Sequence, residues 1–302
     1  MRSQAQEAVE QHLIELGRRM AASAPLAPHK AARVAMENYF TAAPLPSVRL
    51  LPASPATLKA EWLLDRDVDC SRRMLFLHGG GYVAGGLTAY RHFGMWIAQA
   101  MRCAVLLIEY RLAPEHPFPA ALEDALTAFR WMREHGPEGP GPAERAFLLG
   151  DSAGGGLALA TLLALRDRSA GRADAAVTFS AWTDLTNSGE SMVSNANPRL
   201  GAVKAVPDWF AGLYLAGKDP RDPLASPLFG TLEGLPPLFM QASAAEQFLD
   251  DSARFAQKAR AAGGEVHLDV WPDMVHVWQG FAPQLPEAIE ALRRAGEFIG
   301  AI

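Results

Sequence analysis

A serine stands among glycines in 150-GDSAGGG-156, which contains the pattern Gly150-x-Ser152-x-Gly154. The pattern lies between a strand-like run, 146-AFLLG-150, and an apolar helix-like run. Small residues on both sides of a serine let the chain turn sharply from strand to helix and hold the hydroxyl in the open. The stretch predicts a nucleophilic serine, although a glycine-rich turn ahead of a helix explains these residues equally well when they are taken alone.

A serine hydroxyl is a poor nucleophile, so the same chain must supply a base and an acid that orients the base. Among eight histidines, His276 follows the last strand-like run and precedes the last helical pattern. That position is the sheet edge at which α/β proteins assemble their sites. We interpret five others as surface, packing or structural residues, and the sequence suggests no role for His92; the five are His12, His29, His116, His135 and His267.

Three carboxylates compete for the role of the acid in 244-AAEQFLDD-251, which follows the strand-like run 237-PLFMQAS-243. Glu246 belongs to the loop at the end of that run. Asp250 and Asp251 come where the pattern becomes helical, and there an acidic residue is suited to capping the helix. We therefore predict Glu246 as the acid and keep Asp250 as the alternative.

Five glycines crowd the stretch 78-HGGGYVAGG-86, directly after an apolar run. Attack on an ester builds negative charge on the carbonyl oxygen, and each amide N–H fixed beforehand around that oxygen lowers the barrier by about 3 kcal/mol. We predict such N–H donors at Gly80 and Gly81, joined by Ala153 after the serine, and we expect His78 to brace the loop by hydrogen bonding. The alternative of a phosphate-binding loop lacks a following Gly-Lys-Ser/Thr and a dinucleotide fingerprint.

The elements that must position these residues alternate along the chain. Near-continuous apolar runs separated by helical patterns predict a mostly parallel sheet covered on both faces. Helical patterns follow Pro119, Gly156 and Phe248, and a last helix from Pro286 is expected to turn Ile289, Leu292 and Ile299 inward. The eight strand-like runs are 47-SVRLLP-52, 60-AEWLL-64, 74-MLFLH-78, 104-AVLLIEY-110, 146-AFLLG-150, 175-AAVTFS-180, 237-PLFMQAS-243 and 265-EVHLDVW-271.

Two segments fall outside this alternation. Residues 1–45 and 185–225, the second rich in Pro, Gly and Asn with aromatic residues, predict a helical cap over the site. Residues 46–184 and 226–302 then form the α/β core, so that the chain is one domain with a lid. A surface excursion without function is the alternative for the second segment.

Composition narrows the class of protein. The 302 residues are 49% hydrophobic and 20% charged, with a net charge of −5 and no Lys/Arg block, which argues against a nucleic-acid partner. The charged N-terminus lacks the apolar core of a secretion signal, and the longest apolar run is too short to span a bilayer. Cys70 and Cys103 form neither a disulfide framework nor a metal cluster. We expect Cys103 to be buried and the protein to be cytoplasmic.

Several motifs together resemble one family, the hormone-sensitive-lipase-like branch of the α/β-hydrolases, also called bacterial type IV esterases. They are 78-HGGGY-82, 109-EYRLAPEHPFPAAL-122, 150-GDSAGGG-156, 225-ASPL-228 and the segment around His276. The resemblance runs from about residue 45 to the C-terminus, and the order serine, acid, histidine is that of the family. It implies an α/β-hydrolase fold with a cap and hydrolysis of short- to medium-chain carboxylic esters. It also implies no cofactor, no membrane partner and often a homodimer.

Two departures from the family pattern stand near the site. Many members have Asp where this chain has Glu246, and the more usual His-Gly-Phe reads 276-HVW-278. The stretch 244-AAEQFLDDS-252 is similar to a subset that includes a monoterpene lactone hydrolase, so cyclic esters join the expected substrates. The alternative function is a non-catalytic small-molecule receptor on the same fold. Because such a receptor is expected to have lost the base, His276 argues against it.

Overall fold

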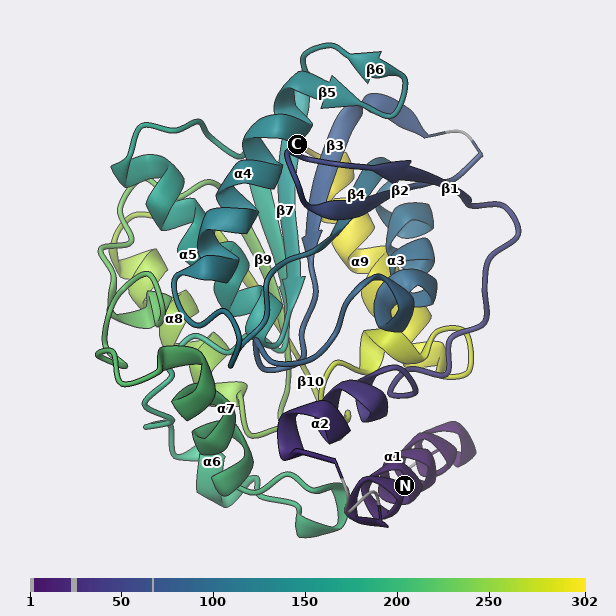
Figure 1. Ribbon diagram of the computed structural model, residues 1–302, viewed down its shortest axis with the longest axis vertical. Coiled ribbons are helices and arrows are strands. Elements are labelled where there is room, and N and C mark those ends of the chain that lie inside the picture. Colours follow the sequence, from purple (N-terminus) through teal and green to yellow (C-terminus); the bar gives the residue numbers. More distant parts are fainter. Residues whose placement is uncertain (1–2, 23–25, 67) are drawn as a thin grey trace.

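The computed structural model describes residues 3–22, 26–66 and 68–302, and a sheet of eight strands runs through its centre (Figure 1). The strand order is β1-β2-β4-β3-β7-β8-β9-β10. β2 pairs antiparallel with β1 and β4, and the remaining pairs are parallel. All eight predicted runs are strands, so the prediction of a mostly parallel sheet is confirmed: β1 (Arg49–Ala53), β2 (Lys59–Leu64), β3 (Asp69–Leu77), β4 (Cys103–Glu109), β7 (Arg145–Asp151), β8 (Ala175–Phe179), β9 (Leu238–Ser243) and β10 (Val266–Trp271).

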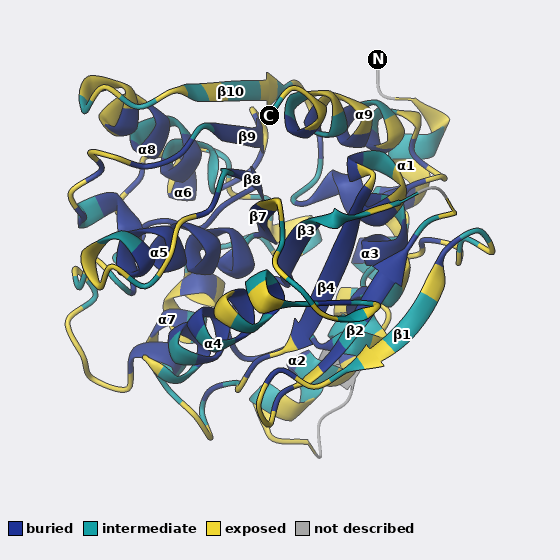
Figure 2. Ribbon diagram, turned by 90° about the horizontal axis from the view of Figure 1, so that it is seen from above, coloured by how far each residue is buried: buried dark blue, intermediate teal, exposed yellow. Residues whose placement is uncertain are grey.

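Helices cover both faces of the sheet, and the inner strands are buried almost throughout (Figures 1 and 2). α4 (Ala120–Glu134), α5 (Ala153–Asp167) and α8 (Leu249–Ala261) pack on one face around side chains such as Leu159 and Phe255. α3 (Leu87–Met101) and α9 (Pro286–Gly300) pack on the other face, around Phe93 and Leu292. The two apolar clusters explain why the strands lack the alternation of a half-exposed sheet.

Three features depart from the sequence prediction. α3 was not predicted, although its inward residues Tyr90, Phe93, Ile97 and Met101 have helical spacing. A short hairpin, β5 (His135–Gly136) with β6 (Gly139–Pro140), was also missed. The prediction for Ile289 was wrong: it is 44% exposed. The inward stripe of α9 runs through Ala288, Ala291, Leu292, Ala295 and Ile299, and Ile289 lies one residue off this stripe.

The helices outside the sheet gather at one end of the molecule, along the lower edge of Figure 1. They are α1 (Gln4–Ala22), α2 (Pro28–Met36), α6 (Ser191–Ser194) and α7 (Ala205–Leu215), with a 3₁₀ turn at Pro198–Leu200 between the last two. Further 3₁₀ turns lie at Pro227–Phe229 and Trp278–Phe281. α1 contacts the Pro198–Leu200 turn, so the N-terminal segment and the insertion after β8 touch although they are far apart in the sequence.

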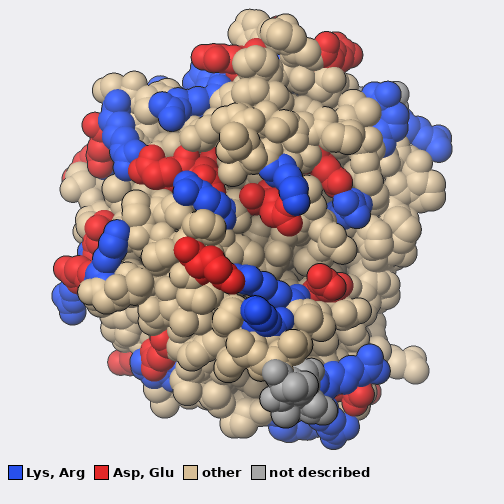
Figure 3. Space-filling view, in the orientation of Figure 1, with Lys and Arg blue, Asp and Glu red and all other residues tan. Residues whose placement is uncertain are grey.

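Charged side chains of both signs intermingle on the face seen in Figure 3. Among the described residues, no helix combines the length and the apolar character needed to cross a bilayer. Cys103 is fully buried, as predicted, and both cysteines are free thiols.

Gly296 allows α9 to approach α3 closely. A methyl group in its place would collide with the carbonyl oxygen of Ala100, near the end of α3. Gly300, in the same helix, has open space where a Cβ would stand. Substitution of Gly296 therefore affects both the packing of α9 and its helix propensity, whereas substitution of Gly300 affects helix propensity alone.

We expect Gly296→Ala to lower the free energy of unfolding by about 1–3 kcal/mol, because the backbones of two helices must move apart. Gly300→Ala is the matched control and should stabilise the protein by about 0.5 kcal/mol through helix propensity alone. Urea unfolding of both variants measures the difference. Equal effects in the two variants would contradict the packing argument.

Candidate active site

Ser152 occupies a strained turn between β7 and α5. Its φ is 52° and its ψ is −122°, a backbone conformation that residues other than glycine rarely adopt. Methyl groups at Gly150 or Gly154 would collide with neighbouring backbone: Gly150 faces the carbonyl of Gly154, and Gly154 faces the carbonyl of Leu77 at the end of β3. The two glycines flanking Ser152 are therefore required by close packing, and the turn holds the serine hydroxyl at the surface of the elbow.

Asp151 joins this elbow to the glycine-rich loop. Its Oδ1 accepts the N–H of Gly79 at 2.9 Å, and its Oδ2 accepts the hydroxyl of Tyr90 at 3.0 Å. A side chain at Gly79 would collide with Oδ2 of the same carboxylate. Burial raises the pKa of the Asp151 carboxyl to about 7, against the opposing effect of these two hydrogen bonds. The sequence prediction assigned no role to Asp151, although its place directly before Ser152 in the motif was a usable signal.

The loop after β3 presents bare backbone towards Ser152. Gly80 and Gly81 have φ of 107° and 63°, which glycine adopts without strain. Within the described residues, the N–H groups of Gly80, Gly81 and Ala153 donate to no protein acceptor. Because unpaired amide groups in a buried region are costly, these three are free to bind an oxygen of a ligand.

His78 braces this loop, as the sequence predicted. Its Nδ1 lies 2.8 Å from the carbonyl oxygen of Gly79, and its ring stacks on Tyr110 with 4.2 Å between centroids. The hydroxyl of Tyr110 donates to the carbonyl of His78 at 2.7 Å. Burial lowers the pKa of His78 to about 4, so the ring is neutral at pH 7.

His276 lies beside Ser152, in the loop between β10 and the Trp278–Phe281 turn. Its Nε2 is 2.9 Å from Oγ of Ser152, and its Nδ1 is 2.5 Å from Oε2 of Glu246. The His276 side chain is 28% exposed and that of Glu246 only 1%. The N–H of Val277 donates to Oγ of Ser180 at 3.2 Å, which ties the histidine loop to the end of β8. The three predicted residues thus form one continuous chain of hydrogen bonds.

Glu246 is held by its own loop as well as by the histidine. Its Oε1 accepts the N–H of Ser243, the last residue of β9, at 2.8 Å. Oγ of Ser243 in turn accepts the N–H of Met274 and donates to the carbonyl of the same residue. The carboxylate is therefore fixed between the end of β9 and the loop that carries His276.

Asp250 and Asp251 do not cap α8, so that part of the sequence prediction was wrong. The carboxylate of Asp250 accepts the N–H of Ser191 in the insertion. The carboxylate of Asp251 accepts the N–H groups of Thr183 and Asp184 and is fully buried. The described structure gives α8 no side-chain cap of its own. Both aspartates instead receive N–H groups from the chain that leaves β8.

Five other histidines have structural partners. His267 stacks on Phe239, His135 stacks on Trp131, and Nδ1 of His92 lies 2.9 Å from the carbonyl of Ala42. His12 contacts the carbonyls of Asn38 and Tyr39, and His29 lies near Glu115. His92 could not be placed from the sequence because its helix, α3, was not predicted.

Tyr39 is a second site neighbour that the sequence did not indicate. Its hydroxyl is 3.5 Å from the carbonyl oxygen of His276. Burial, with the nearby carboxylates of Asp151 and Glu246, raises the Tyr39 pKa far above its usual value. A neutral phenol from the segment after α2 therefore backs the histidine loop.

The arrangement can activate a hydroxyl and stabilise an oxyanion. A histidine between a serine and a buried carboxylate can take the serine proton and hold it as an imidazolium. Three N–H groups without a described protein acceptor, those of Gly80, Gly81 and Ala153, belong to the elbow and to the loop packed against it. Among the described residues, no cluster of His, Cys, Asp or Glu has the arrangement of a metal site.

Comparison with known proteins agrees with this geometry. A family described as having the alpha/beta hydrolase fold matches residues 74–280. An acetyl-hydrolase of Streptomyces hygroscopicus is 43% identical over 240 residues, which make up 80% of this chain and 79% of that protein. Carboxylesterase NlhH of Mycobacterium tuberculosis is 33% identical over 226 residues, 73% of this chain and 70% of that protein.

A solved structure is similar over nearly the whole chain. It is an esterase from the bacterial hormone-sensitive lipase family, with a TM-score of 0.91 and 39% identity, covering 99% of this chain and 98% of that one. The sheet, the elbow and the sequence relatives lead to one assignment. The chain belongs to the α/β-hydrolase fold family, in its bacterial hormone-sensitive-lipase-like branch of esterases.

Proposed function

We propose that the protein is a serine carboxylesterase that hydrolyses short- to medium-chain carboxylic esters, lactones included, through an acyl-enzyme. Carboxylic ester hydrolysis is the activity of its relatives. The observation that carries the serine mechanism is the hydrogen-bonded chain Ser152–His276–Glu246, with distances of 2.9 and 2.5 Å. The substrate is a small-molecule ester, and the chemistry requires no cofactor.

In the first half of the reaction, Nε2 of His276 takes the proton of Ser152, and Oγ attacks the ester carbonyl. The N–H groups of Gly80, Gly81 and Ala153 hold the oxyanion that forms. The imidazolium, stabilised by Glu246, then protonates the leaving alcohol as the acyl–oxygen bond breaks. In the second half, His276 activates a water that attacks the acyl-enzyme and releases the acid.

The receptor alternative has less support. A receptor needs a binding pocket, but it does not need a serine, a histidine and a carboxylate joined by hydrogen bonds. Strain at Ser152 and free N–H groups are devices of catalysis. The cytoplasmic location and the homodimer stay predictions.

We further propose that residues 1–45 and 185–225 form a cap over this site. The ring of Phe210, in α7, packs directly against Gly81 of the loop with free N–H groups. Tyr214, one turn further along α7, stacks on Tyr82 with 3.7 Å between ring centroids. Arg33, in α2, donates to the carbonyls of Val83 and Ala113. Both segments thus contact the glycine-rich loop, which supports a role in shaping the acyl pocket.

The nucleophile is tested by Ser152→Ala. The variant should fold normally and lose at least about 10⁴-fold in kcat on p-nitrophenyl acetate, keeping only what binding and the oxyanion donors supply. In the wild type, a burst of p-nitrophenol should precede steady turnover. A flat trace from correctly folded wild-type protein would favour the receptor, and activity of the variant within tenfold of wild type would exclude Ser152.

The acid is tested by Glu246→Gln beside Asp250→Asn. The glutamine keeps the shape but turns an N–H towards Nδ1 of His276, which favours the wrong tautomer, so kcat should fall by about 10³–10⁴-fold. Asp250→Asn retains an oxygen for the N–H of Ser191 but removes its charge, so it should lose about 1 kcal/mol of stability with less than tenfold loss of kcat. If the two results were reversed, the acid would be Asp250.

The cap is tested by Phe210→Ala across p-nitrophenyl esters of increasing chain length. Removal of the ring over Gly81 should raise kcat/KM for the octanoate relative to the acetate on the order of tenfold, because the pocket gains room for methylene groups. Val206→Ala, in the first turn of the same helix at a 41% exposed position, is the matched control. An unchanged preference in Phe210→Ala would count against the cap.

A further inference from the structure

We propose that Asn195 and Ser191, at the start of the insertion after β8, are positioning residues that hold the loop carrying Glu246 in its reactive place. The proposal rests on the proposed function, because it takes Glu246 as the acid of the triad. It takes residues 183–195, which we call the clamp, out of the proposed cap and gives them the role of positioning Glu246.

Asn195 grips the backbone on both sides of Glu246. Its Nδ2 donates to the carbonyl of Ala244 at 2.9 Å and to the carbonyl of Glu246 itself at 3.0 Å. Both hydrogens of one amide are thus spent on the loop that bears the acid. The Glu246 side chain reaches His276 only if this backbone stays in register, because its Oε1 is already tied to Ser243.

Ser191 fixes the other end of the same loop. Its hydroxyl donates to the carbonyl of Gln247 at 2.7 Å and accepts the N–H of Asp250 at 3.0 Å. Its own N–H donates to the carboxylate of Asp250 at 2.9 Å. Nε2 of Gln247 completes the joint by donating to the carbonyl of Met192. The first turn of α8 therefore donates an N–H to a hydroxyl of α6, a distant part of the chain, and not to a capping side chain at its own start.

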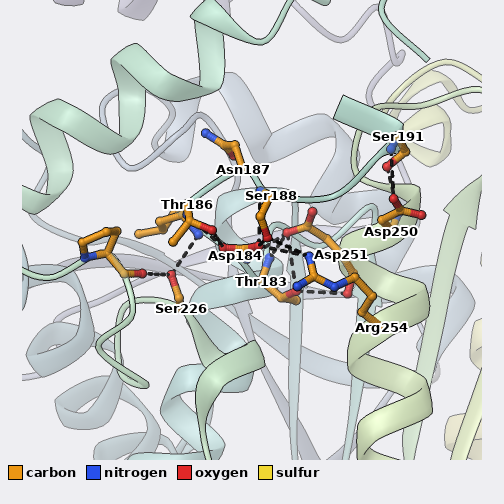
Figure 4. A network of polar contacts seen from close by, with 12 residues as sticks. Thr183, Asp184, Thr186, Asn187, Ser188, Ser191, Ser226, Asp250, Asp251 and Arg254 are labelled. Atoms are coloured by element: carbon orange, nitrogen blue, oxygen red, sulfur yellow. Dashed lines mark hydrogen bonds and ion pairs between the residues drawn. The ribbon is translucent and has the colours of Figure 1, made fainter. Parts of the chain in front are cut away.

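Two buried carboxylates, those of Asp184 and Asp251, anchor the clamp itself (Figure 4). Oδ1 of Asp251 accepts the N–H groups of Thr183 and Asp184 at 2.7 and 2.8 Å. The carboxylate of Asp184 accepts the hydroxyls of Thr186 and Ser188 and pairs with Arg254 at 3.1 Å. These contacts join the chain after β8 to α8. The clamp is thus rigid where it leaves the sheet, and a rigid base is what lets Asn195 hold a loop in place.

Two residues beyond Asn195, the backbone forms hydrogen bonds within the insertion and not with the loop that bears Glu246. Asn197 exchanges two hydrogen bonds with Ala202, at 2.7 and 3.0 Å, inside the insertion. This makes Asn197 a matched control for Asn195, with the same side chain two residues further along. The cap therefore begins just after Asn195, at residue 196, eleven residues later than the start at 185.

The first experiment compares Asn195→Ala with Asn197→Ala on p-nitrophenyl acetate. Loss of the two Nδ2 bonds lets the acid loop drift, and a small misplacement of a catalytic group has a large effect on rate. We expect kcat of Asn195→Ala to fall about tenfold with KM within about twofold, whereas Asn197→Ala should match the wild type. Wild-type kcat in Asn195→Ala, or equal losses in the two variants, would overturn the proposal.

A double variant distinguishes failure of this proposal from failure of the proposed acid. In a Glu246→Gln background, Asn195→Ala should cause less than about twofold further loss, because residues that act as a unit are not additive. Full activity of Glu246→Gln would contradict both the assignment of Glu246 as the acid and the role of the clamp. An inactive Glu246→Gln together with a fully active Asn195→Ala would contradict the role of the clamp alone. If Asn195→Ala fails to fold by circular dichroism, Ser191→Ala carries the same test with the same expected loss of kcat.

Discussion

The site depends on one close approach, between the elbow that carries Ser152 and the loop that follows β3. Gly154 has room for a hydrogen only, because the carbonyl of Leu77 faces it, and Gly79 donates its N–H to Asp151. The strained backbone at Ser152 persists because surrounding contacts over-determine it. The same contacts hold the loop that contains Gly80 and Gly81 against the elbow that contains Ala153. The glycines are thus needed, first of all, for the close approach of the two backbones. That approach in turn brings the loop after β3 next to the elbow.

From this point the parallel sheet determines where the other partners must lie. β7, β8, β9 and β10 are neighbours in order and run the same way, so their carboxyl ends meet at one edge. Ser152, the Ser180 that fixes the histidine loop, Glu246 and His276 each follow one of these four strands. Each residue therefore lies only a few positions beyond the end of its strand. Hydrogen bonds between successive loops keep these four side chains close together. Glu246 is buried beside a partly exposed His276, which suits the proposed roles of an acid sheltered from water and a base open to substrate.

The sequence predicted the fold and the triad because both leave local signals. Long apolar runs identified all eight strands, and residue type with chain order selected Ser152, Glu246 and His276. It missed what depends on contacts between distant segments. Asn195 bears no motif, and its role appears only when the chain after β8 folds back on the loop after β9. Asp250 and Asp251 were predicted as helix caps because they lie at the start of a helix, which is a local signal. Their carboxylates instead accept N–H groups from Ser191 and Thr183, which are distant in the sequence.

The glutamate at position 246, where the sequence departs from the expected family pattern, is accommodated by the geometry of its loop. A glutamate is one methylene longer, so a carboxylate aimed straight at His276 would overreach unless the loop retreated. Here the side chain bends back, and Oε1 accepts the N–H of Ser243, three residues earlier, while Oε2 faces Nδ1 of the histidine. The backward bond takes up the extra length, and it is charge-assisted, which makes it strong. The same bond gives Oε1 a partner, so that each of the two carboxylate oxygens is held by a hydrogen bond. The longer acid is therefore held at two points, and its reach depends on Ser243 and on whatever keeps residues 244–247 from shifting along the chain.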